Sequence, residues 1–151
     1  MSELKTFTQD DLFFMHAALE EAGRAYEMGE VPIGAVVVVD GRIIGRGYNQ
    51  TESLRDVTAH AEMLALTSAQ NTLGAKVLPE CTLYVTVEPC VMCAGAIRWS
   101  RIARLVWGCD EPKSGFTTIS REILHPKTFW TGGVLADEAA ELMRRFFEHR
   151  R

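Results

Sequence analysis

The chain has 151 residues, of which 47% are hydrophobic and 24% charged, a balance typical of a soluble globular protein. This length fits one domain over residues 1–151 with a sizeable buried core, and the net charge of −4 gives no indication of a nucleic-acid binder. No apolar run approaches the length that spans a bilayer and the first ten residues lack a signal-peptide pattern, so we expect a cytoplasmic protein that does not bind a membrane.

The first third of the chain predicts a helix followed by a β-hairpin. Apolar residues recur at close to helical spacing over residues 11–28. Residues 33–39 form an apolar run typical of a buried strand, and residues 42–48 are predicted to return beside it. Asp40 and Gly41 between them predict a tight turn, because both residue types tolerate the positive φ angles of a two-residue hairpin loop.

A polar loop over residues 49–57 leads to the second predicted helix, over about residues 59–69. Thr58 is a suitable N-cap for this helix, since its hydroxyl can accept a hydrogen bond from a backbone N–H of the first turn. This arrangement places His60 in the first helical turn.

A β-α-β unit is predicted next. Residues 82–87 are rich in β-branched and aromatic side chains, which is typical of a strand. Pro89 suits the first turn of a following helix. Cys90 is therefore expected at the helix N-terminus, where the positive end of the macrodipole favours a thiolate. Residues 103–108 predict a second strand, parallel to the first.

The last part of the chain is less regular until its final helix. Residues 109–133 contain several prolines and glycines, and we expect a loop with one short helix near residues 120–124. Residues 136–149 predict an amphipathic helix. Its core-facing residues are expected to be Leu142, Met143 and Phe146. Together these elements predict an α/β fold, with a mostly five-stranded sheet between helices.

Two short segments hold the residues that indicate chemistry. His60 and Glu62 lie at the start of one predicted helix, and Cys90 and Cys93 at the start of another. Thiols three residues apart share a helix face and can bind one ion together. One imidazole and two thiolates leave the fourth position of a zinc site open, which is typical of catalytic zinc. We therefore expect His60, Cys90 and Cys93 to bind the metal. Glu62 is expected to reach the bound water, a pattern typical of zinc deaminases.

Two other uses of the cysteines are weighed against this hypothesis. A lone Cys-x-x-Cys could be a redox pair, but no second feature resembles a thioredoxin-like unit. A closed four-cysteine zinc site would need another pair, and Cys81 and Cys109 are not spaced as one. These two are expected to be buried or half-buried free thiols.

Several segments resemble the cytidine-deaminase-like superfamily and, within it, the bacterial tRNA-specific adenosine deaminases. The segments are residues 30–36, Asn49, residues 58–63, 83–86 and 88–96. The resemblance implies a three-layer α-β-α domain with a five-stranded mixed sheet and one Zn²⁺ per subunit. It also implies a homodimer that takes the tRNA anticodon loop as substrate and converts adenosine to inosine at the wobble position.

The resemblance further implies roles for individual residues. Glu62 is predicted to move protons between the attacking water and the purine ring. Asn49 is predicted to read the base, with Val31 as an apolar wall and Ala61 as a further substrate contact. From the residues alone, a turn-forming asparagine and a core valine are the alternatives at the first two positions.

Two competing functions share the same motifs. A deaminase of a free base or nucleotide, of guanine or cytosine type, would use the same metal and glutamate without an RNA-binding surface. A non-catalytic zinc scaffold would keep the fold, but such a site needs no acid at position 62.

Two local features bear on contacts with RNA. The sequence differs from the family pattern at Val57, at Glu111 in place of the usual aspartate, and in a shorter segment over residues 125–131. Arginines gather in two clusters, which indicate either a basic stripe for RNA or solvated helix faces. The clusters are Arg98, Arg101 and Arg104, and Arg144, Arg145, Arg150 and Arg151.

Overall fold

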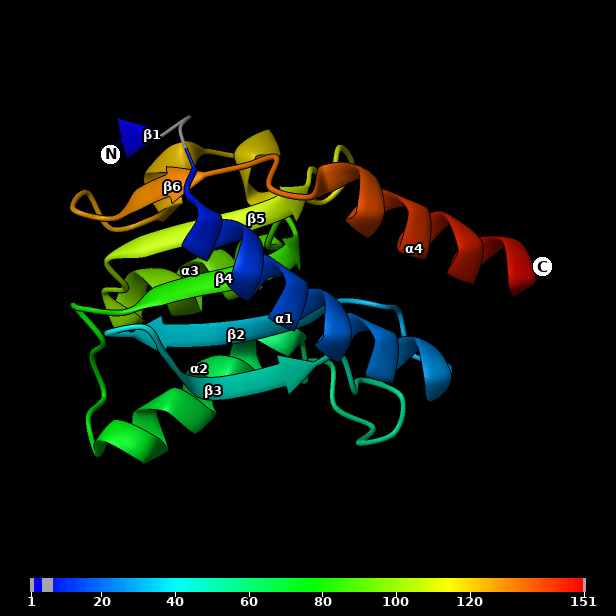
Figure 1. Cartoon of the computed structure of the whole chain (residues 1–151), viewed down its shortest axis with the longest axis horizontal. Coiled ribbons are helices and arrows are strands. Elements are labelled where there is room, and N and C mark those ends of the chain that lie inside the picture. The colour runs from blue at the N-terminus through cyan, green and yellow to red at the C-terminus, as the bar shows by residue number, and fades with distance from the viewer. Residues whose placement is uncertain (1, 4–6, 151) are drawn as a thin grey trace.

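The computed structural model describes residues 2–3 and 7–150, which form one mixed β-sheet between layers of helices (Figure 1). Its strands are β1 (Ser2–Glu3), β2 (Gly34–Val39), β3 (Arg42–Tyr48), β4 (Thr82–Val87), β5 (Arg104–Cys109) and β6 (Phe129–Thr131). They lie in the order β1-β6-β5-β4-β2-β3, with β2 antiparallel to both its neighbours and the other pairs parallel. The predicted α/β fold with a five-stranded mixed sheet is confirmed. The sequence located four of these strands, β2 to β5; β6 is the fifth, and the two-residue β1 adds a short edge strand.

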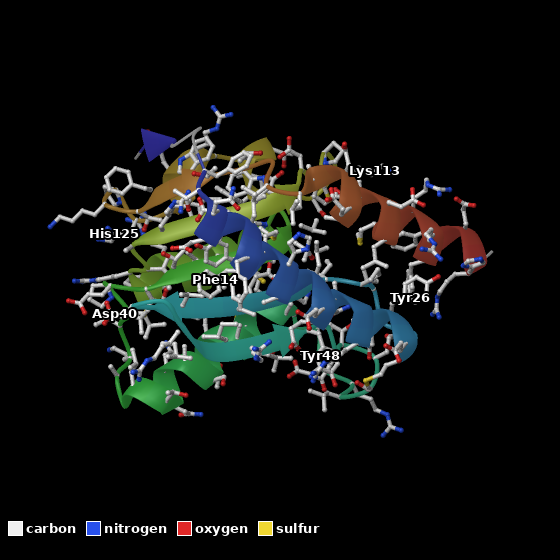
Figure 2. The ribbon with its side chains drawn as sticks, in the orientation of Figure 1. Phe14, Tyr26, Asp40, Tyr48, Lys113 and His125 are labelled. Atoms are coloured by element: carbon white, nitrogen blue, oxygen red, sulfur yellow. The ribbon has the colours of Figure 1, made fainter. Side chains whose placement is uncertain are left out.

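Helices cover both faces of the sheet. Helix α1 (Gln9–Glu27) lies on one face, whereas α2 (Ala61–Leu73) and α3 (Val91–Ser100) lie on the other (Figure 1). Each face has its own apolar core. Phe14 of α1, labelled in Figure 2, has its ring centroid 5.6 Å from that of Tyr84 in the sheet. Residues of α2 and α3 pack on the opposite face. None of the described helices is long and apolar enough to cross a membrane.

The first helix and the hairpin agree closely with the sequence. Helix α1 begins two residues earlier than predicted because Thr8 and Asp11 form a reciprocal capping box, with Asp11 N–H donating to Thr8 Oγ1. In the hairpin, Asp40 and Gly41 have φ angles of 50° and 71°. The predicted two-residue turn is therefore confirmed. It lies at the opposite end of the sheet from Tyr48 (Figure 2).

Helix α2 lies unusually close to β3, and two glycines permit this approach. A Cβ atom on Gly47 would lie 2.4 Å from the backbone oxygen of Ala61, and one on Gly45 would lie 2.4 Å from that of Ala65. Since real Cβ contacts are not that short, any larger residue would push the helix off the strand. The small residues on both elements therefore set the position of the α2 N-terminus.

Three details of the predicted helix starts were wrong. Thr58 does not cap α2: its backbone N–H and hydroxyl both donate to Asp56 Oδ1, at 2.8 and 2.7 Å. The helix begins at Ala61, and His60 is its N-cap rather than a first-turn residue. Similarly, Pro89 precedes the α3 N-cap, Cys90, instead of lying in the first turn. The prediction of Cys90 at the helix N-terminus was correct.

The C-terminal third contains more structure than predicted. Residues 109–133 include two short 3₁₀ helices, at Phe116–Thr118 and Arg121–Ile123, and the missed strand β6. Helix α4 (Ala136–His149) has the predicted bounds. Its buried residues are Ala139 and Phe146, so the expectation that Leu142 and Met143 also lie in the core was wrong: both are only partly buried. Helix α4 instead contacts β5 and the end of α1, where Phe146 meets Tyr26.

Candidate metal centre and active-site cavity

Three predicted metal ligands converge at the N-termini of α2 and α3. His60 is the N-cap of α2, Cys90 is the N-cap of α3, and Cys93 lies in the first turn of α3. The Nδ1 atom of His60 lies 3.4 Å from Cys93 Sγ and 3.6 Å from Cys90 Sγ. All three potential ligand atoms lie within 4.8 Å of one another.

This spacing fits a tetrahedral zinc ion. With zinc–sulfur bonds of about 2.3 Å and zinc–nitrogen bonds of about 2.0 Å, a tetrahedral angle separates nitrogen from sulfur by about 3.5 Å. The two observed separations, 3.4 and 3.6 Å, agree with that value. Among the described residues, no fourth histidine, cysteine or acidic side chain joins the cluster. The donor set thus leaves one coordination position for solvent or substrate, as the sequence predicted.

The electrostatics of the cluster favour a thiolate at Cys90. A hydrogen bond from the Cys93 thiol lowers the pKa of Cys90 to about 4, with a further contribution from His60. The same hydrogen bond, together with burial, raises the pKa of Cys93. Hydrogen bonding to Cys90 raises the pKa of His60 above its ordinary value. Negative charge at Cys90 also lies at the positive end of the α3 dipole.

Glu62 lies beside this cluster and is almost fully buried, with 4% of its surface exposed. Burial raises the pKa of its carboxyl group to about 7, although hydrogen bonding to its own backbone and the charge of His60 act in the opposite direction. A carboxyl group that exchanges protons near neutral pH is suited to general acid–base catalysis.

A cavity of about 280 Å³ opens onto the cluster. Its lining residues are Val31, Ile33, Asn49, Thr51, His60, Ala61, Glu62, Val87, Glu88, Cys90, Glu111, Ser114 and Met143. The structure therefore brings the predicted substrate contacts, Asn49, Val31 and Ala61, into one cavity with Glu62. Asn49 is 7% exposed, and its buried Oδ1 has no hydrogen-bond partner within the described part of the chain. An unsatisfied buried acceptor at a cavity wall is suited to receive a ligand donor.

Six of the residues that line the cavity were not predicted from the sequence to do so: Ile33, Thr51, Val87, Glu88, Ser114 and Met143. The helical spacing of Met143 predicts a core residue, but α4 places this side chain at the cavity that holds His60 and Glu62. Glu88 and Ser114 carried no separate signal, apart from the position of Glu88 next to the Pro-Cys-x-x-Cys motif. Glu111, one of the positions where the sequence differs from the pattern that the resemblance implies, lines the cavity. Val57, another such position, is 82% exposed in the loop before His60.

Several arginines of the two clusters have structural partners. Arg104 pairs with Asp11 through two hydrogen bonds of 2.7 and 3.0 Å. Arg98 donates to the backbone oxygens of residues 122–124. Arg144 pairs with glutamates on its own helix. These contacts give three of the arginines a structural role that does not require RNA.

Residues 8–109 match the family described as the cytidine and deoxycytidylate deaminase zinc-binding region. The chain belongs to this deaminase family. The match covers every residue of the His-Cys-Cys cluster and Glu62, and the family's zinc-binding region together with the cluster fits one Zn²⁺ per chain. The cysteines outside the cluster, Cys81 and Cys109, are free thiols, buried and half-buried as expected.

Individual relatives of this deaminase are similar over almost their whole length. A tRNA-specific adenosine deaminase of Agrobacterium fabrum is 47% identical over 143 residues, which cover 91% of this chain and 94% of the relative. A solved structure from studies of A-to-I editing by tRNA:A34 deaminases at the wobble position has a TM-score of 0.81 and 46% identity, covering 86% and 98% of the two chains. The guanine deaminase of Nitrosomonas europaea has a TM-score of 0.78 and 27% identity, covering 95% and 86%.

Proposed function

We propose that this deaminase converts adenosine to inosine at the wobble position of the tRNA anticodon. The observation that carries the proposal is a buried acid, Glu62, in one cavity with a His-Cys-Cys cluster that leaves a coordination position open. The choice of substrate is supported by relatives that act on tRNA at 46–47% identity. The free-base alternative has weaker support, since the guanine deaminases of Nitrosomonas europaea and Bacillus subtilis are 27% and 35% identical.

In this proposal His60, Cys90 and Cys93 hold the zinc ion. Bound zinc supplies Lewis-acid activation of a water molecule. Glu62 takes a proton from the attacking water and delivers it to N1 of adenine, which makes C6 more electrophilic. Once oxygen has bonded to C6, Glu62 takes the second proton of the former water from that oxygen and passes it to the amino group. The bond between C6 and the amino nitrogen then breaks, ammonia leaves, and the oxygen remains on C6 as the carbonyl of inosine. One carboxyl group can serve both steps because burial raises its pKa above the ordinary value for glutamate, which favours holding a proton between the two transfers.

Asn49, Val31 and Ala61 are proposed to hold the base. The unpartnered Oδ1 of Asn49 can accept a hydrogen bond from a donor on the purine, and this contact would satisfy a buried polar atom. Val31 supplies an apolar surface for the ring and Ala61 a small one at the floor beside Glu62. A base from an anticodon loop would have to turn out of its stack to reach this cavity.

The substrate and the acid are tested in one experiment. The purified protein is incubated with anticodon stem-loop RNA, free bases and nucleosides, and ammonia and inosine are measured. We expect inosine at the wobble position of the RNA, and a loss of at least about 100-fold in rate for Glu62→Ala with zinc content retained. Deamination of free bases alone would favour the alternative function, and full activity of Glu62→Ala would contradict the role of the acid.

We also propose that residues 1–151 act as one domain in the cytoplasm and pair as a homodimer through α2 and α3. The pairing is supported by a groove of about 690 Å³ between these helices, lined in part by Met63, Leu66, Val77 and Trp99. Trp99 is 75% exposed, and a large apolar surface of this kind is typical of a protein interface. A two-fold axis beside α3 would bury both copies of Trp99.

The oligomeric state tests this pairing directly. Light scattering after gel filtration should give twice the chain mass for the unaltered protein and the single chain mass for Trp99→Glu. Phe13→Glu is the matched control, because Phe13 is also exposed, at 66%, but lies on α1 across the sheet. A dimer that survives Trp99→Glu would contradict an interface at this groove.

A further inference from the structure

We propose that Glu88 is a positioning residue that holds the segment of residues 111–117 as a wall of the substrate cavity, and so sets the place of Glu111 and Ser114 beside the bound nucleotide. The consequence for substrate rests on the proposed function. The claim about the segment itself rests on the contacts of Glu88 alone.

The side chain of Glu88 is the centre of these contacts. It follows β4, is 5% exposed, and receives three hydrogen bonds from the opposite segment. Its Oε1 accepts from the backbone N–H of Glu111 at 3.0 Å. Its Oε2 accepts from the backbone N–H of Thr117 at 3.0 Å and from the Thr117 hydroxyl at 2.7 Å. One side chain thus holds both ends of the segment.

Two cavities border the segment, and only part of it is packed: Phe116 is fully buried against Trp107, whereas residues 112–114 are exposed. The catalytic cavity of about 280 Å³ lies on one side, and a second cavity of about 400 Å³ lies on the other. Glu88 and Glu111 line both. Residues 112–114 therefore depend more on hydrogen bonds, such as the one from Glu111 to Glu88, than the packed end of the segment at Phe116 does.

The backbone of the segment lies directly against the strand end that carries Glu88. Gly115 forms a β-bridge with Cys90, and Phe116 N–H donates to the Pro89 oxygen at 2.8 Å. A Cβ atom on Gly115 would lie 2.3 Å from the Glu88 carboxyl group, so only glycine permits this approach. The side chain of Glu88 is therefore enclosed by the segment that it holds.

Glu111 connects Glu88 to the residues that line the substrate cavity. Its backbone is bound by Glu88, and its own Oε2 accepts from the backbone N–H groups of Lys113 and Ser114, at 3.0 and 3.3 Å. Lys113 lies at the same end of the sheet as Tyr48 (Figure 2), which is the end where the hairpin leads to Asn49. Release of Glu111 would therefore shift Ser114 as well.

The change Glu88→Gln isolates this restraint. An amide has one accepting oxygen, and the two donors of Thr117 would retain it. The amide NH₂ then faces the backbone N–H of Glu111. Both groups are donors, so the hydrogen bond to Glu111 is lost while the size and shape of the side chain are preserved. Glu21→Gln is the matched control: Glu21 is also buried, at 2% exposure, but lies on α1 on the other face of the sheet.

Three measurements on the zinc-loaded protein separate the possible results. Hydrogen exchange of peptides covering residues 109–118 should be faster in Glu88→Gln and unchanged in Glu21→Gln. With anticodon stem-loop RNA, Glu88→Gln should raise KM by about tenfold, the effect of losing one buried hydrogen bond, and change kcat by less than about threefold. Zinc content should stay at one ion per chain. Thr117→Val, which keeps the backbone donor, should raise KM by less.

If hydrogen exchange and KM in Glu88→Gln both match those of the unaltered protein, the proposal is overturned. Loss of zinc or a fall in kcat at unchanged KM would also overturn it, since Glu88 would then act on the metal segment instead. If the unaltered protein leaves the RNA unreacted, the proposed function fails, while the exchange experiment still decides whether Glu88 holds the segment.

Discussion

His60 and Cys90 occupy the N-cap positions of α2 and α3, where serine, threonine, aspartate and asparagine are preferred because their side chains bind free backbone N–H groups. Neither side chain makes such a bond. Both face the centre between the two helices instead. At the scale of single residues, two N-cap positions are therefore occupied by potential metal ligands, and both helices lack the stabilising hydrogen bond that a capping side chain would provide.

Cys90→Ser tests this relation. The serine hydroxyl can cap α3, which is worth up to about 1 kcal/mol, but it is a poor ligand for zinc. After chelation, thermal unfolding should show the variant to be at least as stable as the unaltered chain. Without chelation, elemental analysis should find substoichiometric zinc and turnover should be lost. Stoichiometric zinc in the variant would contradict the assignment of Cys90 as a ligand.

Asn49→Ala tests the reading of the base. The Oδ1 atom has no partner among the described residues, so its removal breaks no hydrogen bond of the fold. We expect the free energy of unfolding to change by less than about 1 kcal/mol and kcat/KM for the RNA to fall by about 10- to 100-fold. Gln50→Ala, at the adjacent position outside the cavity lining, is the control. Equal losses in both variants would argue against a specific contact by Asn49.

At the scale of elements, the site depends on how closely α2 lies on β3. The helix start carries His60 and Glu62, and the glycines of β3 determine its distance from the sheet. If a methyl group on one of these glycines pushed α2 away from β3, both His60 and Glu62 would move relative to α3. Positions that never touch substrate thus control the geometry of the site.

Gly47→Ala should therefore lower both stability and activity. The added Cβ would lie 2.4 Å from the Ala61 backbone oxygen, and overpacking of this kind costs about 1–3 kcal/mol. Denaturant unfolding and steady-state kinetics would measure the two effects. Gly23→Ala is the control: this mid-helix position in α1 has no atom within 4 Å of the added Cβ and should gain up to about 1 kcal/mol.

At the scale of the whole molecule, Asp11 joins helix α1 to two neighbouring strands of the sheet, β4 and β5. Its buried carboxyl group binds Arg104 of β5 through both oxygens and accepts a hydrogen bond of 2.8 Å from the Tyr84 hydroxyl of β4. Burial alone would raise the pKa of Asp11. The hydrogen bonds from Arg104, Thr8 and Tyr84 outweigh it and hold the pKa below the ordinary value.

This network predicts a defined acid dependence of stability. Because the pKa of Asp11 is lower in the folded state, its contribution is fully present above about pH 4, the unfolded value, and is lost as the pH falls through the folded pKa. Asp11→Asn should lower the free energy of unfolding at pH 7 by about 3–5 kcal/mol, as expected for a broken buried ion pair. The difference from the unaltered chain should shrink below about pH 4 in denaturant titrations.

Glu141→Gln provides the comparison, since Glu141 pairs with Arg144 on the exposed face of α4. Solvent and salt screen an exposed pair of this kind, so this variant should unfold almost as the unaltered chain does at every pH. A similar loss in both variants would mean that burial of the Asp11 pair has no special effect.

The sequence by itself determined what depends on residue type and short spacing. The turn at Asp40-Gly41 requires positive φ at two adjacent positions, and the Cys-x-x-Cys pair needs only the pitch of one helix turn. The cluster of His60, Cys90 and Cys93, with Glu62 beside it, could be predicted because these residue types combine in few ways other than a zinc site.

Only the tertiary structure decided which distant segments form the cavity wall. Met143 reads as a core residue because a helical period indicates a face but not what that face meets. Thr58 has the residue type of an N-cap, but in the fold its backbone N–H and its hydroxyl both donate to Asp56. The role of Glu88 depends on Thr117, 29 positions away. Long-range contacts arise from packing the whole chain at once, and local sequence patterns carry little information about that packing.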